Sequence, residues 1–330
     1  MRDTIQLAHG SGGLENQQLI RELFFSAFDN PILAEAEDAA LINGGTLAVS
    51  TDSFTVSPLF FPGGDIGKLA VAGTLNDVAM RGARPQHLTV AFIIEEGLKL
   101  NTLASIVISM REELAVSGAQ VIAGDTKVVP RGAIDQLMIN TTGFGTIVSN
   151  CNTRRITGGD HLIISGNIAR HGACIFAARE EIAINGLASD CCTLWPAIAP
   201  LLDAGLDVHA MRDATRGGIS AVFNEWAQQT GFCLNIRQDD IPVSSEVRGF
   251  AEILGIDPYV LACEGVFVLA VAPHDSAAVI DLLHRHGHPQ ATLVGTVEVA
   301  QQQPTVLLHS AYGTRRRMEY PSGEILPRIC

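Results

Sequence analysis

The order of apolar patterns in the first half of the chain constrains the fold most, because strand-like and helix-like stretches alternate there. In the segment 65–82, Val71, Leu75 and Val78 recur at helical spacing, and the segment 99–117 has the same period. The expected elements are a strand at 46–50, a helix at 65–82, a strand at 88–94, a helix at 99–117, and strands at 119–123 and 136–148. This order predicts an α/β unit, with helices and a sheet in an α+β layered arrangement.

The second half repeats this alternation after a polar stretch at 150–160, whose Thr157-Gly158-Gly159 favours a turn. Strands are expected at 161–165, 206–211, 265–272, 291–298 and 304–309, and helices at 169–182, 217–230 and 274–287. A chain of 330 residues is long for a single hydrophobic core, so we expect two domains, at 1–150 and 151–310.

The last segment, 311–330, differs from both halves because it keeps neither a helical nor a strand period over any length. It contains Arg315-Arg316-Arg317 and the ending Pro327-Arg328-Ile329-Cys330, and we expect a flexible C-terminal tail. Its residues, fully extended, reach at most roughly 65 Å at about 3.3 Å each, which is enough to bring Cys330 to a distant site. The three arginines either dock an acidic partner or keep the tail solvated.

Charge and cysteine content exclude several classes of function. The formal net charge of −13 argues against non-specific binding to nucleic acid or to anionic lipid. The N-terminus shows no apolar signal region, and no apolar run reaches the length of a membrane span. The 7 cysteines are odd in number and form no C-x-x-C pair, which indicates reduced thiols in a cytoplasmic protein. Cys174 and Cys263 lie in apolar segments and are expected to pack in the core.

Aspartates recur beside small residues and expected turns in the first half, at Asp38, Asp52, Asp77 and Asp125. Asp52 and Asp125 are expected just beyond two of the strands, and Lys127 follows closely. Each aspartate alone is more often a turn or cap residue. Together they offer carboxylates for Mg²⁺ and a lysine for phosphate.

Two glycine-rich stretches offer backbone groups to an anion. His9-Gly10-Ser11-Gly12-Gly13 is either a loop whose N–H groups wrap phosphates or a flexible leader, and it matches neither a P-loop nor a dinucleotide fingerprint. Arg212-Asp213-Ala214-Thr215-Arg216-Gly217-Gly218 lies between an expected strand and an expected helix. The N-terminus of a helix favours a phosphate or metal contact at that point.

Five motifs follow one another along the chain: Glu37-Asp38-Ala39-Ala40, Thr51-Asp52, Asn76-Asp77-Val78-Ala79, Gly124-Asp125-Thr126 and Asp213-Ala214-Thr215-Arg216-Gly217-Gly218. In this order they resemble the superfamily of aminoimidazole ribonucleotide synthetase, selenide water dikinase and thiamine-monophosphate kinase. The ending Pro327-Arg328-Ile329-Cys330 is similar to that of the HypE family of hydrogenase maturation factors, the carbamoyl dehydratases. The loop His9 to Gly13 lacks the cysteine expected of a selenide water dikinase.

The resemblance implies an aminoimidazole-ribonucleotide-synthetase-like fold of two domains, and a homodimer whose N-terminal domains pair their sheets into a barrel. It implies that ATP and Mg²⁺ lie in a cleft between the domains. The implied nucleotide and phosphate ligands are Gly12, Gly13, Asp38, Asp52, Lys127 and Asp213, and the implied metal ligands are Asp38, Asp77, Asp125 and Asp213. The implied partners are the carbamoyltransferase HypF, which loads Cys330, and the HypC–HypD iron scaffold, which receives cyanide for [NiFe] hydrogenase.

The implied reaction removes water from a carbamoyl group on Cys330 and leaves a thiocyanate. Phosphorylation by ATP would turn the amide oxygen into a good leaving group, and a general base would take the nitrogen proton. The candidate bases are Glu264 and His171. The competing interpretations are a solvated strand edge for Glu264 and a polar residue at a helix start for His171. Arg328 favours the Cys330 thiolate, whereas the adjacent α-carboxylate opposes it.

Two other functions fit the same motifs. A small-molecule kinase or synthetase of the superfamily would keep full activity on a free substrate after deletion of 321–330. An ATP-sensing scaffold would use the tail to bind partners and would keep its function with Cys330→Ala. His284, His286 and His288 are expected to form a solvated helix end, because no cysteine or acid completes a metal set.

Overall fold

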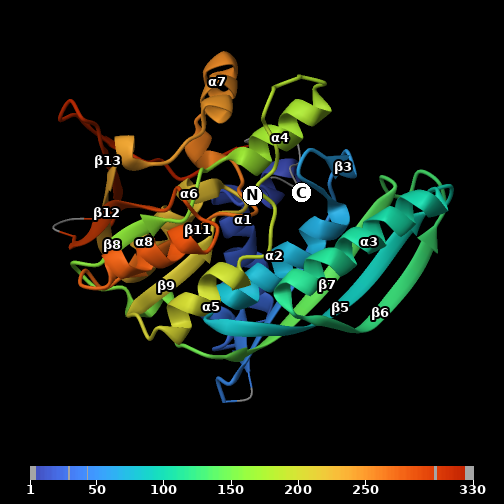
Figure 1. The fold of residues 1–330 in the computed structure, drawn as a ribbon, viewed down its shortest axis with the longest axis horizontal. Helices are drawn as coiled ribbons and strands as arrows, with labels where there is room; N and C mark the ends of the chain where they lie inside the picture. Colours follow the sequence, from blue (N-terminus) through green and yellow to red (C-terminus); the bar gives the residue numbers. More distant parts are fainter. Residues whose placement is uncertain (1–4, 29, 43, 301–302, 324–330) are drawn as a thin grey trace.

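The first half of the chain forms a five-stranded sheet. The computed structural model describes all residues except 1–4, 29, 43, 301–302 and 324–330. The sheet runs in the order β1 (Ala40–Ile42), β2 (Leu47–Phe54), β7 (Leu137–Ile147), β5 (Ala83–Glu95) and β6 (Gln120–Val129). β5 and β6 pair in parallel through the crossover helix α3 (Leu100–Ser117), and the other neighbours pair antiparallel. β6 therefore lies at an edge of the sheet (Figure 1).

Helix α2 (Ile66–Met80) lies between the two halves and is buried on nearly all sides. On one side it packs against β7, where Gly145 makes room, because a Cβ there would lie 2.5 Å from a side chain of α2. On another side Asn76 donates its amide N–H to the Cys192 carbonyl and accepts the Leu194 N–H. These two hydrogen bonds tie the helix to the second half of the chain.

The second sheet has seven strands, in the order β14 (Arg315–Arg317), β13 (Val306–His309), β10 (Phe232–Arg237), β12 (Thr292–Val299), β8 (His161–Ile164), β11 (Phe267–Val271) and β9 (Val208–Asp213). The helices of this half are α4 (Arg170–Arg179), α5 (Trp195–Asp203), α6 (Gly218–Thr230), α7 (Ser245–Leu254) and α8 (Ser276–Arg285). Every residue of β11 is buried, as its continuous apolar run indicates. Across the described part of the chain, no helix is both long and apolar enough to cross a membrane.

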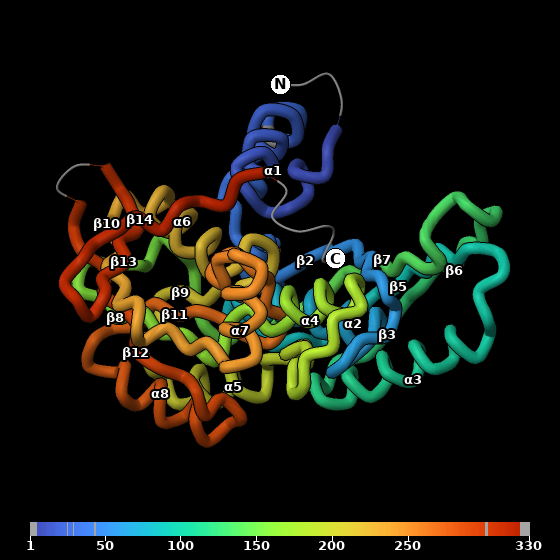
Figure 2. The backbone as a smooth tube through the Cα atoms, turned by 90° about the horizontal axis from the view of Figure 1, so that it is seen from above, coloured from blue at the N-terminus to red at the C-terminus, as the bar shows by residue number. Residues whose placement is uncertain are grey.

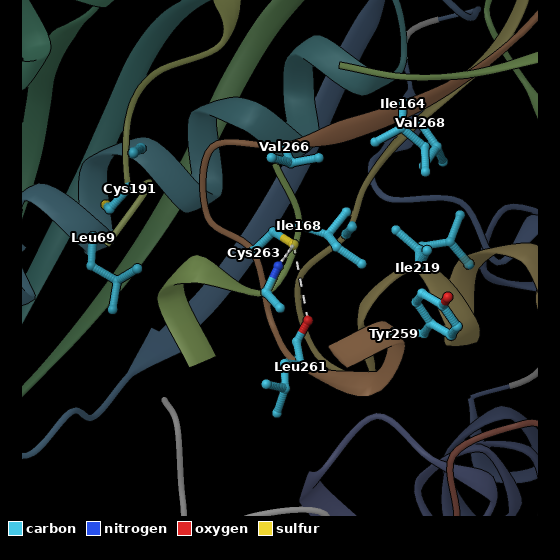
Figure 3. Close-up of a cluster of buried hydrophobic side chains, with 14 of the residues drawn as sticks. Leu69, Ile164, Ile168, Cys191, Ile219, Tyr259, Leu261, Cys263, Val266 and Val268 are labelled. Carbon is cyan, nitrogen blue, oxygen red and sulfur yellow. Dashed lines mark hydrogen bonds between the residues drawn. The ribbon is translucent and has the colours of Figure 1, made fainter. Parts of the chain in front are cut away.

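One hydrophobic core runs through both halves, although each half has its own sheet. Leu69 of α2, Ile164 of β8 and Cys263, which precedes β11, belong to the same cluster of buried side chains (Figure 3). Cys263 Sγ accepts the Ala169 N–H at 3.1 Å, and Cys174 is also buried. The expectation that these two cysteines pack in the core is confirmed.

Two of the strands that carry predicted site residues run further toward their C-terminal ends than the sequence pattern indicates. β2 continues to Phe54 and β6 to Val129, so Asp52, Asp125 and Lys127 lie within strands and not just beyond them. The expected positions were wrong because polar residues interrupt the apolar run without ending the backbone pairing. Strand pairing needs backbone groups and tolerates polar side chains wherever one face is open to water.

The expectation of a free tail over 311–330 is wrong for its described part. Arg315–Arg317 forms β14, which pairs antiparallel with β13, and Met318 is 3% exposed. Beyond Met318 the chain passes α6 and reaches the N-terminal helix α1 (Leu14–Leu19) (Figure 2). The ending Pro327-Arg328-Ile329-Cys330 lies outside the described residues.

Candidate functional site

A cavity of about 610 Å³ lies where the two halves meet, and it gathers acidic residues from distant parts of the chain. Its walls come from the N-terminal segment, β2, α2, the end of β9 and helix α6. The residues of this acidic cavity that were predicted from the sequence are Gly12, Asp38, Asp52, Asp77, Asp213 and Glu264. The fold therefore brings acids of both halves into one site.

Three carboxylates form the centre of the acidic cavity, and we call them the carboxylate trio. Asp38, Asp77 and Asp213 each offer one oxygen, and these oxygens lie within 4.8 Å of one another. Asp38 precedes β1, Asp77 lies near the end of α2, and Asp213 ends β9. Ser50 of β2 donates its hydroxyl to Asp77 Oδ2 at 2.7 Å. A set of carboxylate oxygens suits a hard divalent cation.

Burial and neighbouring carboxylates raise the pKa of each member of the trio. Burial, followed by Asp52, Asp213 and Asp38, raises the pKa of Asp77 well above its usual range. Burial also raises the pKa of Asp38, against the opposing effect of Arg212. The pKa of Asp213 rises to about 7, again mainly through burial. A carboxylate withdrawn from water beside other carboxylates binds its proton more tightly.

The atoms of the trio fit a bound cation. Asp38 Oδ2 is buried and, among the described residues, has no hydrogen-bond partner. A buried oxygen without a partner in a native site indicates a place for an ion or an ordered water. A cation between the three carboxylates would satisfy this oxygen and offset their repulsion. Asp125, also predicted as a metal ligand, does not join the trio.

A pair of charges that was not predicted holds Asp38 in place. Arg212 Nε lies 2.6 Å from Asp38 Oδ1, and Arg212 Nη2 lies 3.1 Å from Glu225 Oε2. Burial opposes the charge of Arg212, but the carboxylates of Asp38 and Glu225 outweigh it and raise the pKa of Arg212. Arg212 stood inside a recognised motif, but Glu225 lies about two turns into α6 with no local signal. Its role depends on the ion pair that joins α6 to the end of β9.

Glu264 belongs to the cavity wall and is 4% exposed, so its interpretation as a solvated strand edge is wrong. Burial, followed by Asp213 and Asp190, raises its pKa well above the usual range. Asp190 accepts the N–H groups of Glu264 and Gly265 at 3.2 and 3.0 Å, which fixes the backbone there. A carboxyl group with a raised pKa in a cavity is suited to take up and release a proton.

His171 and Gly13 are not part of the cavity wall. His171 is 0% exposed near the start of α4, where its Nδ1 lies 2.8 Å from Ser189 Oγ and its ring packs edge-on to Phe61. Gly13 precedes α1 and faces the C-terminal end of the chain, because a Cβ there would lie 2.5 Å from the Pro321 carbonyl oxygen. The structure therefore does not bring these two predicted residues together with the carboxylate trio.

Asp125 and Lys127 do not reach the acidic cavity of their own chain. Both are exposed on β6, at the edge of the five-stranded sheet. On the same strand Val121, Ile122 and Val128 are 47%, 57% and 64% exposed. An edge strand that exposes apolar side chains is a surface for pairing with another chain.

Comparison with known proteins agrees with this architecture. Residues 36–147 match the family AIR synthase related protein, N-terminal domain, and residues 157–306 match AIR synthase related protein, C-terminal domain. Over 339 aligned residues the chain is 46% identical to the carbamoyl dehydratase HypE of Escherichia coli (strain K12). The alignment covers 99% of this chain and 100% of that relative.

Two solved structures are similar over nearly the whole chain. A crystal structure of a HypE–HypF complex has a TM-score of 0.88 and 41% identity, covering 92% of this chain and 99% of that chain. A crystal structure of hydrogenase maturation protein HypE in complex with ATP has a TM-score of 0.84 and 39% identity, covering 99% of this chain and 100% of that chain. The expected aminoimidazole-ribonucleotide-synthetase-like α/β fold is therefore confirmed.

Proposed function

This chain belongs to the HypE family of carbamoyl dehydratases, and on that premise we propose that it uses ATP to convert an S-carbamoyl group on its own Cys330 into a thiocyanate. The observation that carries the proposal is the carboxylate trio of Asp38, Asp77 and Asp213 in a cavity large enough for a nucleotide. The similar HypE structure with bound ATP supports the choice of nucleotide.

The reaction proceeds in two balanced steps. First, the oxygen of the carbamoyl group takes the γ-phosphoryl group of ATP, ADP leaves, and the nitrogen releases one of its two protons, so that a carbon–nitrogen double bond forms and the oxygen becomes part of an imidoyl phosphate. Second, a base removes the remaining proton from the nitrogen, the carbon–oxygen bond breaks, and inorganic phosphate leaves. The electrons of the nitrogen–hydrogen bond complete the carbon–nitrogen triple bond. Each thiocyanate thus consumes one ATP, and the oxygen removed from the carbamoyl group ends up in the phosphate.

We assign the steps to residues of the acidic cavity. Mg²⁺ held by the carboxylate trio would neutralise charge on the phosphate oxygens. Asp52, which accepts the Thr74 hydroxyl at 3.2 Å, lines the cavity beside the trio and is proposed as a nucleotide contact, together with Gly12 of the N-terminal loop. Glu264 is proposed as the base because it is buried in the same wall. His171, which packs outside the cavity, is not assigned a catalytic step.

We propose that the protein is a homodimer that pairs through the five-stranded sheet. The exposed apolar side chains of β6 support this choice, because water contact with them is unfavourable. Asp125 and Lys127 lie on the same strand. We propose that in a dimer paired there these two residues reach the acidic cavity of the second chain and contribute to metal and phosphate binding.

Partners follow from the reaction and from the relatives. HypF is the proposed source of the carbamoyl group, supported by the similar structure of a HypE–HypF complex. The HypC–HypD scaffold is the proposed acceptor of cyanide for the iron of [NiFe] hydrogenase. We propose that the reaction takes place in the cytoplasm.

Mass spectrometry of the C-terminal peptide tests the function. The chain is incubated with HypF, a carbamoyl donor and ATP, and the peptide that ends in Cys330 is isolated. We expect a carbamoyl adduct on Cys330 that loses one water only when ATP is present. An adduct on another cysteine, or water loss without ATP, would contradict the proposal.

A further inference from the structure

Residues 318–323, which we call the C-terminal segment, are attached to helix α6 by side chains of that helix. Ser220 donates its hydroxyl to the Glu319 carbonyl at 2.6 Å, and Asn224 donates its amide to the Met318 carbonyl at 3.0 Å. Both contacts bind backbone carbonyls. They therefore fix the path of the chain and do not depend on which side chains the segment carries.

The same segment then binds the N-terminal part of the chain. The Leu14 N–H donates to the Pro321 carbonyl at 2.9 Å. The Gly323 N–H donates to the carboxylate of Glu15 at 3.1 Å, and Ser11 donates its hydroxyl to the Gly323 carbonyl at 3.3 Å. The C-terminal segment and the N-terminal helix α1 therefore lie side by side (Figure 2).

Glu225 connects this segment with the carboxylate trio. Its Oε1 accepts the Tyr320 hydroxyl at 2.7 Å and the Gln17 amide at 3.0 Å. Its Oε2 pairs with Arg212, which pairs in turn with Asp38. A single carboxylate thus links the C-terminal segment, the N-terminal helix and the proposed metal site. Hydrogen bonds to a charged group are stronger than those between neutral groups.

The attachment sets where the remaining chain begins. Gly323 is bound to Ser11, the neighbour of Gly12 in the cavity wall. The seven residues 324–330 extend at most roughly 25 Å, at about 3.5 Å each. Without the attachment, the last residue held by strand pairing would be Arg317, and 13 residues would follow it up to Cys330. By the −3/2 power of length, the local concentration of Cys330 would then fall about 2.5-fold.

We propose that Glu225 is a positioning residue, which with Tyr320 holds the C-terminal segment at the rim of the acidic cavity of its own chain. Each cavity then acts on the Cys330 of the same chain. This inference rests on the proposed function, because it concerns the thiol that carries the carbamoyl group. It adds that the reaction takes place within one chain, whatever the number of chains in the assembly.

A mixture of two defective chains tests whether the reaction stays within one chain. Chains with Cys330→Ala and chains with Asp77→Asn are co-expressed with the same tag and purified together. Cyanate then adds across the thiol S–H of Cys330 to form the S-carbamoyl group. After ATP and Mg²⁺ are added, the mass of the C-terminal peptide of the Asp77→Asn chain is measured by mass spectrometry.

The inference predicts that this peptide keeps its carbamoyl group in the mixture, while the wild-type peptide loses one water. Thiocyanate in the mixture would overturn the inference, because an intact cavity would have acted on the Cys330 of another chain. Wild-type protein that forms no thiocyanate would instead refute the proposed function, and this inference with it. The experiment therefore distinguishes failure of this inference from failure of the proposed function.

Tyr320→Phe tests the positioning role, because it removes the hydroxyl bound to Glu225 and leaves the ring. The control is Tyr312→Phe, since Tyr312 is 95% exposed. We expect Tyr320→Phe to slow the first turnover by at most about two- to threefold with unchanged KM for ATP, because the contacts of Ser220 and Asn224 remain. The control should match the wild type. Equal rates for both variants, or a changed KM for ATP in Tyr320→Phe alone, would overturn the role assigned to Glu225.

Discussion

Replacing Asp213 by asparagine should stabilise the metal-free protein at alkaline pH and remove its response to Mg²⁺. Burial, against the opposing effect of Arg212, raises the pKa of Asp213 from 3.8 to about 7. At neutral pH the folded chain therefore binds a proton that the unfolded chain has released. Asp213 does not oppose folding below about pH 4, and it opposes folding increasingly between about pH 4 and pH 7.

The magnitude follows from the size of the pKa difference. About 3 pKa units correspond to about 4 kcal/mol of folding free energy above pH 7. This is an upper limit for the effect of one substitution, because the neighbouring carboxylates Asp38 and Asp77 titrate together with Asp213. A bound cation removes the same penalty, so Mg²⁺ should stabilise the wild type most strongly at alkaline pH.

Denaturant unfolding at about pH 5 and about pH 8, with and without Mg²⁺, measures both effects. We expect Asp213→Asn to raise the free energy of unfolding at about pH 8 by up to about 4 kcal/mol without metal. We also expect Mg²⁺ to add little to the stability of this variant. Asp281→Asn, on the exposed surface of α8, is the matched control and should behave like the wild type. A variant that is less stable than the wild type at about pH 8, or that Mg²⁺ stabilises equally, would refute the reasoning.

Four further substitutions separate the proposed roles. Asp77→Asn should block dehydration but not carbamoyl loading of Cys330, and the mass of the C-terminal peptide measures both. Loss of carbamoyl loading in this variant would mean that Asp77 has a structural role. Glu264→Gln should slow the first turnover about 10²- to 10⁴-fold with ATP affinity unchanged, and an unchanged rate would place the base elsewhere. His171→Ala should lower the free energy of unfolding by about 1–3 kcal/mol yet preserve product formation. Val121→Asp should give monomers by size-exclusion chromatography, and dimers would exclude β6 from the interface.

Local pattern predicted the central helices well but missed others for identifiable reasons. α2 carries an apolar stripe, and α3 ends at Gly118, whose φ of 74° suits glycine. Helix α5 was not expected, because it contains Pro196 and Pro200. Proline usually ends a helical pattern, yet at a helix start, as at Pro196, its missing N–H has little consequence, and α5 also continues past Pro200. Whether a proline ends a helix or is accommodated in one depends on packing against other segments, which the sequence of a single segment does not show.

The sequence predicted which types of residue form the acidic site, but only partly which of the predicted residues lie together in the folded chain. Asp52 and Asp125 have similar sequence surroundings, next to a strand. Strand order separates them, because β2 lies beside the cavity whereas β6 lies at the far edge of the sheet. Arg212 belongs to a recognised motif, but its ion pair with Glu225 gave no sequence signal, since the two residues meet only in the folded chain. The periodicity of side chains predicts which face of a helix or strand is buried, but not which other elements pack against that face.

The contact between the two ends of the chain sets an order of assembly during synthesis. The N-terminal helix leaves the ribosome first, but the groups that bind Leu14 and Glu15 belong to Pro321 and Gly323, near the end of the chain. A nascent chain therefore lacks these contacts until translation is nearly finished, although its earlier parts can fold. The wall of the acidic cavity that contains Gly12 is secured at the same moment as the terminal cysteine is made. A truncated chain would have neither.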